Sequence, residues 1–112
     1  GVFNGRTVVQ EDSQKTNSRQ SNKNLLLSDK ALMNSNPQLE IYADDVKCAH
    51  GSTTGALDKE ALFYMQSRGI SKKNASSILI RGFASEMINE IQHEGTKKYL
   101  LDKFDHWLKD YN

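Results

Sequence analysis

Two side chains that can bind a metal stand two residues apart near the middle of the chain. Cys48 is the only cysteine of the sequence, and His50 follows it within the run from Asp44 to Gly55. Thiolate and neutral imidazole are ligands for zinc and for iron–sulfur chemistry. If the backbone is extended here, the strand period of two places both side chains on one face. Two ligands do not complete a tetrahedral site, so a metal-binding interpretation needs ligands from a second chain.

The same pair has a plainer interpretation, in which a small buried thiol lies beside a surface histidine. The neighbouring Asp44 and Asp45 would point to opposite faces of a strand, which favours a solvated turn over a metal site. Gly51 and Gly55 enclose three small polar residues and predict a tight turn. No Lys-Ser/Thr pair follows in the P-loop arrangement, so this segment is not predicted to bind a nucleotide.

Composition limits the classes of function. The chain has 112 residues, a formal net charge of +1 and mixed acidic and basic residues, without a basic face for nucleic acid. One cysteine excludes an internal disulfide and fits a reducing, cytoplasmic compartment. No apolar run approaches the roughly 20 residues of a membrane span. No paired carboxylates or nucleophile triad are recognisable, so we do not expect an enzyme. The first residue, Gly1, suggests a fragment of a longer protein.

Residues 1 to 47 have the pattern of short strands. Asn4 and Gly5 predict a turn after the first apolar residues. Alternation over Leu39–Ala43 predicts a strand, with Pro37 just before it. Residues 10 to 24 are almost entirely polar, and composition alone would make them a loop or a disordered tract.

After Gly55 the apolar period changes to that of helices. Asp58 is a good N-cap for a first helix, and Gly69 is the expected left-handed stop. Ser71 is expected to cap a second, longer helix, and a third should begin near Thr96.

Three further positions in the helical half have structural interpretations. Gly82 lies inside the second helix, which suggests close approach of another element's backbone. His93 is expected at the C-terminal end of that helix, where a charged imidazole is favourable. His106 is expected on the surface, and neither histidine is assigned to a site.

Three runs, Ser21–Ser28, Pro37–Gly51 and Leu62–Ile70, resemble in order and spacing the C-terminal part of the SufB/SufD family of iron–sulfur cluster assembly proteins. The His50-Gly51 pair followed by serine and threonine, and the absence of cysteine from residues 63 to 66, make the chain more similar to SufD than to SufB.

The resemblance implies a mixed fold, β and then α. Residues 1–55 would form the last coils of a right-handed parallel β-helix, in which the polar tract takes part. Residues 56–112 would form a C-terminal bundle of about three helices that docks SufC. A β-helix cut open exposes unpaired strand groups, so we expect the isolated chain to associate with itself.

The resemblance also implies a function, as a non-catalytic SufD-like subunit of the SufBCD scaffold. The chain would pair with SufB through the β-helix and with the ATPase SufC through its helices. His50, with Cys48 as second candidate, would contribute to a site for iron or a nascent iron–sulfur cluster at the SufB contact, and this chain alone would bind no cofactor. The candidates for SufC docking are Phe63, Tyr64, Gln66, Ser67, Arg68 and Gly69.

Other interpretations remain open from the residues themselves. Phe63 and Tyr64 would equally suit packing between helices. The whole chain would also suit a SufB-type scaffold, or a protein-interaction platform without metal chemistry.

Overall fold

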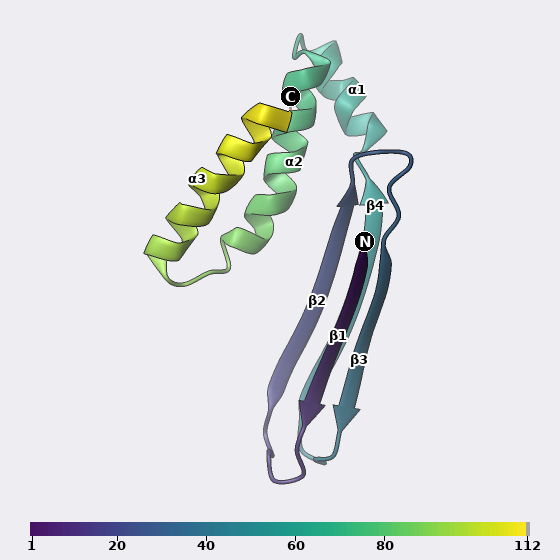
Figure 1. The fold of residues 1–112 in the computed structure, drawn as a ribbon, viewed down its shortest axis with the longest axis vertical. Coiled ribbons are helices and arrows are strands. Elements are labelled where there is room, and N and C mark those ends of the chain that lie inside the picture. The colour runs from purple at the N-terminus through teal and green to yellow at the C-terminus, as the bar shows by residue number, and fades with distance from the viewer. Residues whose placement is uncertain (112) are drawn as a thin grey trace. The chain divides into compact units, whose positions relative to one another are not determined.

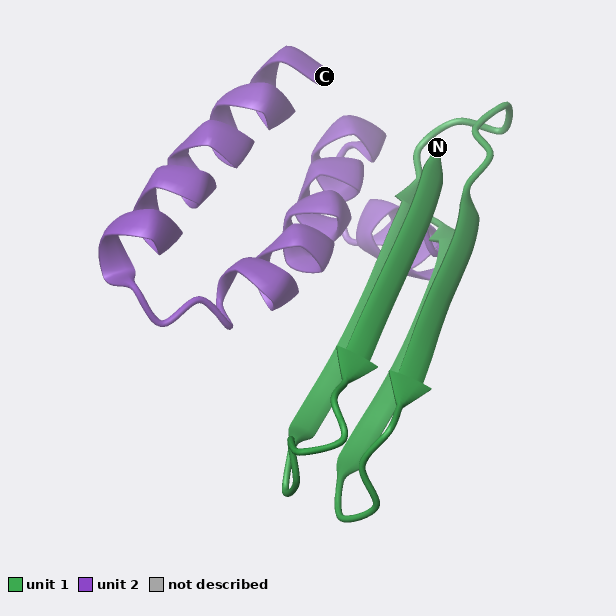
Figure 2. Ribbon diagram, turned by 60° about the horizontal axis from the view of Figure 1, so that its bottom comes forward, with its two compact units in different colours: residues 1–56 green, residues 57–112 purple. Residues whose placement is uncertain are grey.

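The computed structural model describes residues 1–111, and the chain divides into two compact units. The first comprises residues 1–56 and contains only strands, and the second begins at Leu57 and contains only helices (Figure 2). The predicted order, β and then α, is therefore confirmed.

The first unit is built from two parallel two-stranded sheets (Figure 1). Its strands are β1 (Val2–Val9), β2 (Asn17–Leu26), β3 (Asn34–Ile41) and β4 (Lys47–Ala56). β1 pairs with β3 and β2 pairs with β4, so successive strands belong to different sheets. The chain thus passes through both sheets once and then through both again, and each second strand lies in register beside the first.

Polar side chains hydrogen-bond to one another between strands of both sheets. The Ser35 hydroxyl of β3 donates to Oδ1 of Asn22 on β2 at 2.9 Å, and the Ser52 hydroxyl of β4 lies 2.7 Å from that of Ser35. Asn24 donates to Asn22 at 2.7 Å. Because these groups satisfy one another, a polar sequence can form a strand whose side chains face a second sheet.

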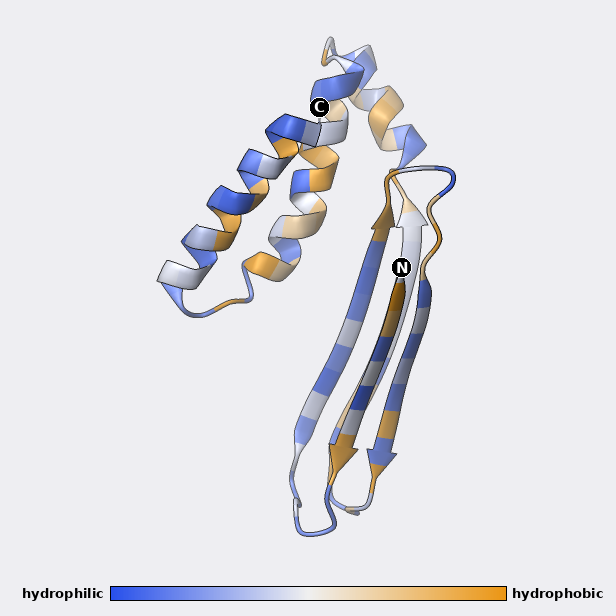
Figure 3. Ribbon diagram, viewed as in Figure 1, coloured by the Kyte–Doolittle hydropathy of each residue, from blue (hydrophilic) through white to orange (hydrophobic). Residues whose placement is uncertain are grey.

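The loop interpretation of residues 10–24 is therefore wrong from Asn17 onward, where β2 begins. Figure 3 shows β2 as hydrophilic along most of its length and hydrophobic only at its end. The strand is specified by pairing with β4, from Asn17 beside Lys47 to Leu26 beside Ala56, and not by its own apolar pattern.

Three turn or boundary predictions in this unit are also wrong. Asn4 and Gly5 lie inside β1, and Gly51 and Gly55 lie inside β4, where parallel pairing holds the backbone extended. Pro37 lies within β3 and not before it. β3 has one neighbour among the described strands, so an open edge tolerates the missing N–H. The predicted solvated turn at Asp44 and Asp45 agrees with their exposure.

The second unit contains three helices, α1 (Lys59–Ser67), α2 (Lys72–Ile88) and α3 (Glu94–Tyr111). The Asp58 carboxylate accepts from two first-turn N–H groups at 2.9 and 3.2 Å, and the Ser71 hydroxyl accepts from the Asn74 N–H at 3.2 Å. Gly69 follows α1 with φ +86°. Both predicted N-caps and the left-handed stop are confirmed.

The third helix and two neighbouring predictions need correction. α3 begins at Glu94 rather than near Thr96. His93 follows the end of α2 by several residues, and its Nδ1 accepts from the Thr96 N–H at 3.1 Å, so it supports the start of α3 instead of the end of α2. A methyl group at Gly82 would meet nothing within 4 Å, so none of the elements within residues 1–111 approaches closely there. His106 is on the surface, as predicted, with 80% of its side chain exposed.

Buried apolar side chains lie on α2 and α3, and an ion pair joins these two helices. Ala75 and Ile80 of α2 and Leu108 of α3 are buried, with 0%, 3% and 7% exposure. Arg81 of α2 makes a two-pronged pair with the Asp105 carboxylate of α3, at 2.8 and 3.0 Å. No helix in the described part of the chain is long and apolar enough to cross a membrane.

Candidate functional site

The two metal-capable side chains share one face of β4. Cys48 and His50 lie two residues apart in an extended strand, so the predicted common face is confirmed. Cys48 is half-buried and is a free thiol, whereas His50 is exposed. In β2 their register partners are Ser18 and Gln20.

A cavity of about 410 Å³ lies beside His50. Its wall comes from two adjacent strands, with Arg19, Gln20 and Ser21 on β2 and Ala49 to Gly51 on β4. The amide oxygen of Gln20 is buried and has no hydrogen-bond partner among residues 1–111. Sequence reasoning missed Gln20, because its place beside His50 depends on the register of strands 30 residues apart in the sequence.

Among the residues that the structure describes, Cys48 and His50 have no third His, Cys, Asp or Glu side chain placed to share a metal ion with them. Within residues 1–111, no group of three or more His, Cys, Asp or Glu side chains is placed to hold a metal ion. Asp45, in the turn before β4, uses its backbone carbonyl to accept from the Lys15 N–H at 2.6 Å and its N–H to donate to the Gln14 side chain at 2.9 Å.

The second set of candidates lies at the C-terminal end of α1. Phe63 and Tyr64 are 74% and 59% exposed, which disagrees with packing between helices. The Arg68 guanidinium lies over the Tyr64 ring, 5.2 Å from its centroid, and the Ser67 hydroxyl donates to the Tyr64 carbonyl at 2.6 Å. These contacts hold an exposed aromatic and a cation together at one end of the helix.

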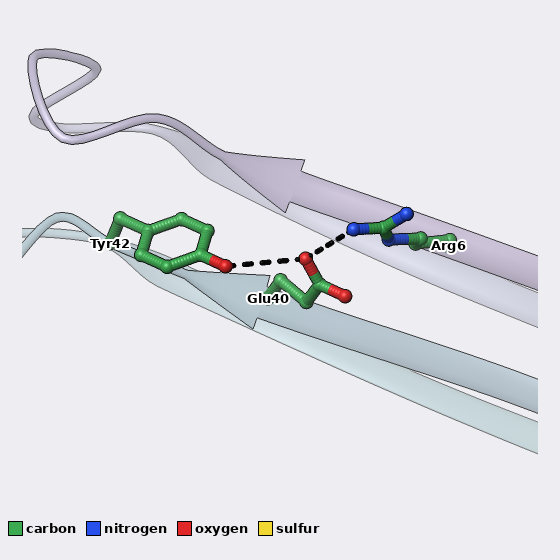
Figure 4. Close-up of polar contacts among 3 residues, drawn as sticks. All are labelled: Arg6, Glu40 and Tyr42. Carbon is green, nitrogen blue, oxygen red and sulfur yellow. Dashed lines mark hydrogen bonds and ion pairs between the residues drawn. The ribbon is translucent and has the colours of Figure 1, made fainter.

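An ion pair of the β unit lies apart from Cys48 and His50, in the other sheet. Arg6 of β1 donates to the Glu40 carboxylate of β3 at 2.6 Å, and the Tyr42 hydroxyl donates to the same oxygen at 3.4 Å (Figure 4). The hydrogen bond from Arg6 lowers the pKa of Glu40, and that carboxylate raises the pKa of Arg6. This cluster cross-links β1 and β3.

Comparison with known proteins places the chain among iron–sulfur cluster assembly proteins. Residues 1–83 match the family model described as "SUF system FeS cluster assembly, SufBD core domain". The chain is 45% identical over 100 residues to the iron–sulfur cluster assembly protein SufD of Escherichia coli, an alignment that covers 89% of the chain and 24% of that protein. It is 37% identical over 108 residues to SufD of Bacillus subtilis, which covers 96% of the chain and 25% of the relative.

A SufBD family protein of Synechocystis is 44% identical over 90 residues, an alignment that covers 80% of the chain and 20% of the relative. The chain therefore spans about a quarter of the length of the curated relatives that it matches.

Proposed function

The chain belongs to the SufBD core family of SUF-system iron–sulfur cluster assembly proteins and is SufD-like. We therefore propose that it is a non-catalytic part of the SufBCD assembly scaffold. In this proposal its strands pair with a SufB-like subunit and its helices dock the ATPase SufC. ATP hydrolysis belongs to SufC, and the iron or nascent cluster is cargo that passes through the SufB contact.

We propose that the β unit forms the last two coils of a right-handed parallel β-helix. The order of the strands supports this, because β1 and β2 are followed by β3 and β4 stacked on them in parallel register. Such stacking leaves strand groups free at the edges of the described sheets, where another coil or another chain can add.

The observation that carries the site proposal is the exposure of His50 on the same strand face as Cys48. An exposed imidazole can reach a ligand set that a second chain completes, and one thiolate with one imidazole leaves two positions of a tetrahedral site for that chain. His50 is the proposed cargo-contacting ligand, and Cys48, deeper in the strand face, is the second candidate.

The SufC-docking proposal is supported by the exposed end of α1. Aromatic and arginine side chains are typical anchors of protein interfaces, and Phe63, Tyr64 and Arg68 are such a group. Nucleotide-driven dimerisation of SufC would then move the helical units of SufB and SufD and strain the strand contact near His50. Such coupling requires contacts that differ between two states of the complex.

The site proposal is tested by His50→Ala in the complex assembled with SufB and SufC. We expect the complex to form but to carry less iron and to give a weaker cluster spectrum after anaerobic reconstitution. His106→Ala is the matched control, because it removes another exposed histidine, on α3. An intact complex with unchanged iron and spectrum would contradict the site and would favour the platform without metal chemistry.

The docking proposal is tested separately by Phe63→Ala and Tyr64→Ala. If these side chains are interface anchors, each should weaken SufC binding by about tenfold or more in a titration. Tyr99→Ala is the control, because Tyr99 is 60% exposed on α3 and outside the proposed surface. Equal effects of all three variants would show that α1 is not the specific docking element.

A further inference from the structure

The helical unit contains a cavity of about 450 Å³ between α2 and α3. The two helices run in opposite directions (Figure 1), and the cavity is lined by the N-terminal half of α2 and the C-terminal half of α3. Its charged lining residues are Lys73 and Arg81 from α2 and Asp105 and Lys109 from α3. Three positive charges and one negative charge give this lining a net charge of +2.

One of the three cations is already paired inside the cavity. Arg81 donates to both carboxylate oxygens of Asp105, at 2.8 and 3.0 Å. The hydrogen bond from Arg81 lowers the pKa of Asp105, and the charges of Arg81 and Lys109 lower it further. Asp105 is therefore ionised at neutral pH and offsets Arg81, so the excess positive charge belongs to the two lysines.

The two lysines are free to bind an anion. Neither Lys73 nor Lys109 has an ion-pair partner among residues 1–111, and both are exposed. Lys109 lies one helical turn after Asp105 on the same face of α3. Because the helices are antiparallel, this turn leads toward Lys73, so both lysines line the cavity beyond the Arg81–Asp105 pair.

The position of Lys73 is not explained by its own helix. α2 begins with Lys72 and Lys73, and its first turn has no acidic residue. The partial positive charge of a helix N-terminus disfavours cations there, so these lysines are placed against the local electrostatic preference. Lys109, in the last turn of α3, is at a favourable end. A bound anion would relieve the repulsion at the start of α2.

We propose that this cavity binds an acidic segment of a partner protein, whose carboxylates pair with Lys73 and Lys109. The ammonium groups extend from two different helices, so carboxylates spread along a peptide can reach them separately. A compact polyanion such as phosphate would lie close to the Asp105 carboxylate and be repelled by it. The proposal goes beyond the function proposed above, because it names a second surface and its ligand class without depending on SufC or iron.

The test is a titration of the ¹⁵N-labelled whole chain with hexaglutamate at low ionic strength, followed by backbone amide chemical shifts. We expect saturable shifts around Lys73 and Lys109 that weaken at high ionic strength, because salt screens exposed charges. Lys73→Gln combined with Lys109→Gln should raise the Kd about fivefold or more, as loss of two exposed ion pairs requires. Lys73→Arg combined with Lys109→Arg keeps both charges and should retain binding.

The matched control removes the same two charges elsewhere on the helical unit. Lys98→Gln combined with Lys103→Gln changes exposed residues of α3 that do not line the cavity. Net charge then falls by the same amount, so any difference between the two double variants reports the location of binding. The control variant should bind hexaglutamate with nearly the Kd of the unmodified chain.

Three results would overturn the proposal. The first is the absence of saturable shifts around Lys73 and Lys109. The second is an equal rise in Kd in both double glutamine variants, which would show attraction by net charge alone. The third is binding of inorganic phosphate at the same amides as tightly as hexaglutamate, which would make the cavity a site for small anions.

Discussion

Ile80 is the large side chain most completely removed from water in the helical unit. It is 3% exposed, whereas Ile78, two residues earlier in the same helix, is 49% exposed. Leu108 of α3 is buried as well, at 7%. The apolar side of this unit therefore depends on a few residues and not on every apolar position of α2.

Replacing Ile80 by alanine should lower the free energy of unfolding by about 2–4 kcal/mol, because transfer and cavity terms add in a buried site. Ile78→Ala is the matched control and should cost less than about 1 kcal/mol. Urea denaturation followed by circular dichroism measures both. Equal losses would show that Ile80 is not the more buried residue in solution.

Glu40 is the residue whose charge links two strands. Its hydrogen bond with Arg6 holds its pKa below the usual value of 4.5, so the ionised form is preferred in the folded state. A carboxylate whose folded pKa is depressed stabilises the protein above its unfolded pKa, and that stabilisation is lost as the pH falls through the folded pKa. The effect is small, because the Arg6 side chain is 62% exposed and the Glu40 side chain 33%, so water screens the pair.

Glu40→Gln should therefore reduce stability at neutral pH and make the variant less sensitive to acid below pH 4.5 than the unmodified chain. Denaturation midpoints across the acidic range would measure the difference. Glu90→Gln replaces an exposed glutamate elsewhere and is the control. If the denaturation midpoints of Glu40→Gln and of the unmodified chain fell equally with pH, the depressed pKa assigned to Glu40 would be contradicted.

At the scale of elements, the helices are bounded by local signals and the strands are not. The Asp58 and Ser71 side chains accept hydrogen bonds from backbone N–H groups in the first turns of α1 and α2. Gly69 supplies the left-handed residue between these two helices. The strands instead require partners far along the chain, as the β1–β3 and β2–β4 registers show.

Two glycines of the helical unit should respond in opposite directions to alanine. Gly82→Ala should stabilise by up to about 1 kcal/mol, because alanine is the better helix former and the added methyl meets nothing within 4 Å. Gly69→Ala should destabilise by about 1 kcal/mol, because φ is +86° there. Thermal unfolding of both variants provides the comparison. A loss of stability in Gly82→Ala would indicate a close neighbour after all.

At the scale of the molecule, the strand unit exposes backbone groups that a neighbour can pair. Each described sheet has only two strands, and such small sheets are marginal on their own. Nearly every residue of β4 is exposed, so no other part of the described chain covers this strand and a neighbouring chain can approach it.

The 112-residue chain should therefore associate with itself by strand addition or stacking. Size-exclusion chromatography with light scattering should show dimers or larger species whose fraction rises with concentration. Lysine at Ser52 and at Thr54, on exposed β4, should reduce the association. A clean monomer at high concentration would refute this expectation.

The sequence by itself determined the order of β and α elements, both helix N-caps and the common face of Cys48 and His50. These features depend on neighbours within a few residues, where spacing and side-chain chemistry act directly. Only the tertiary structure decided that polar residues 17–24 are a strand and that Gln20 lies beside His50. Such a strand is stabilised by hydrogen bonds to residues about thirty positions away in the sequence, and the register of that pairing cannot be predicted from local composition.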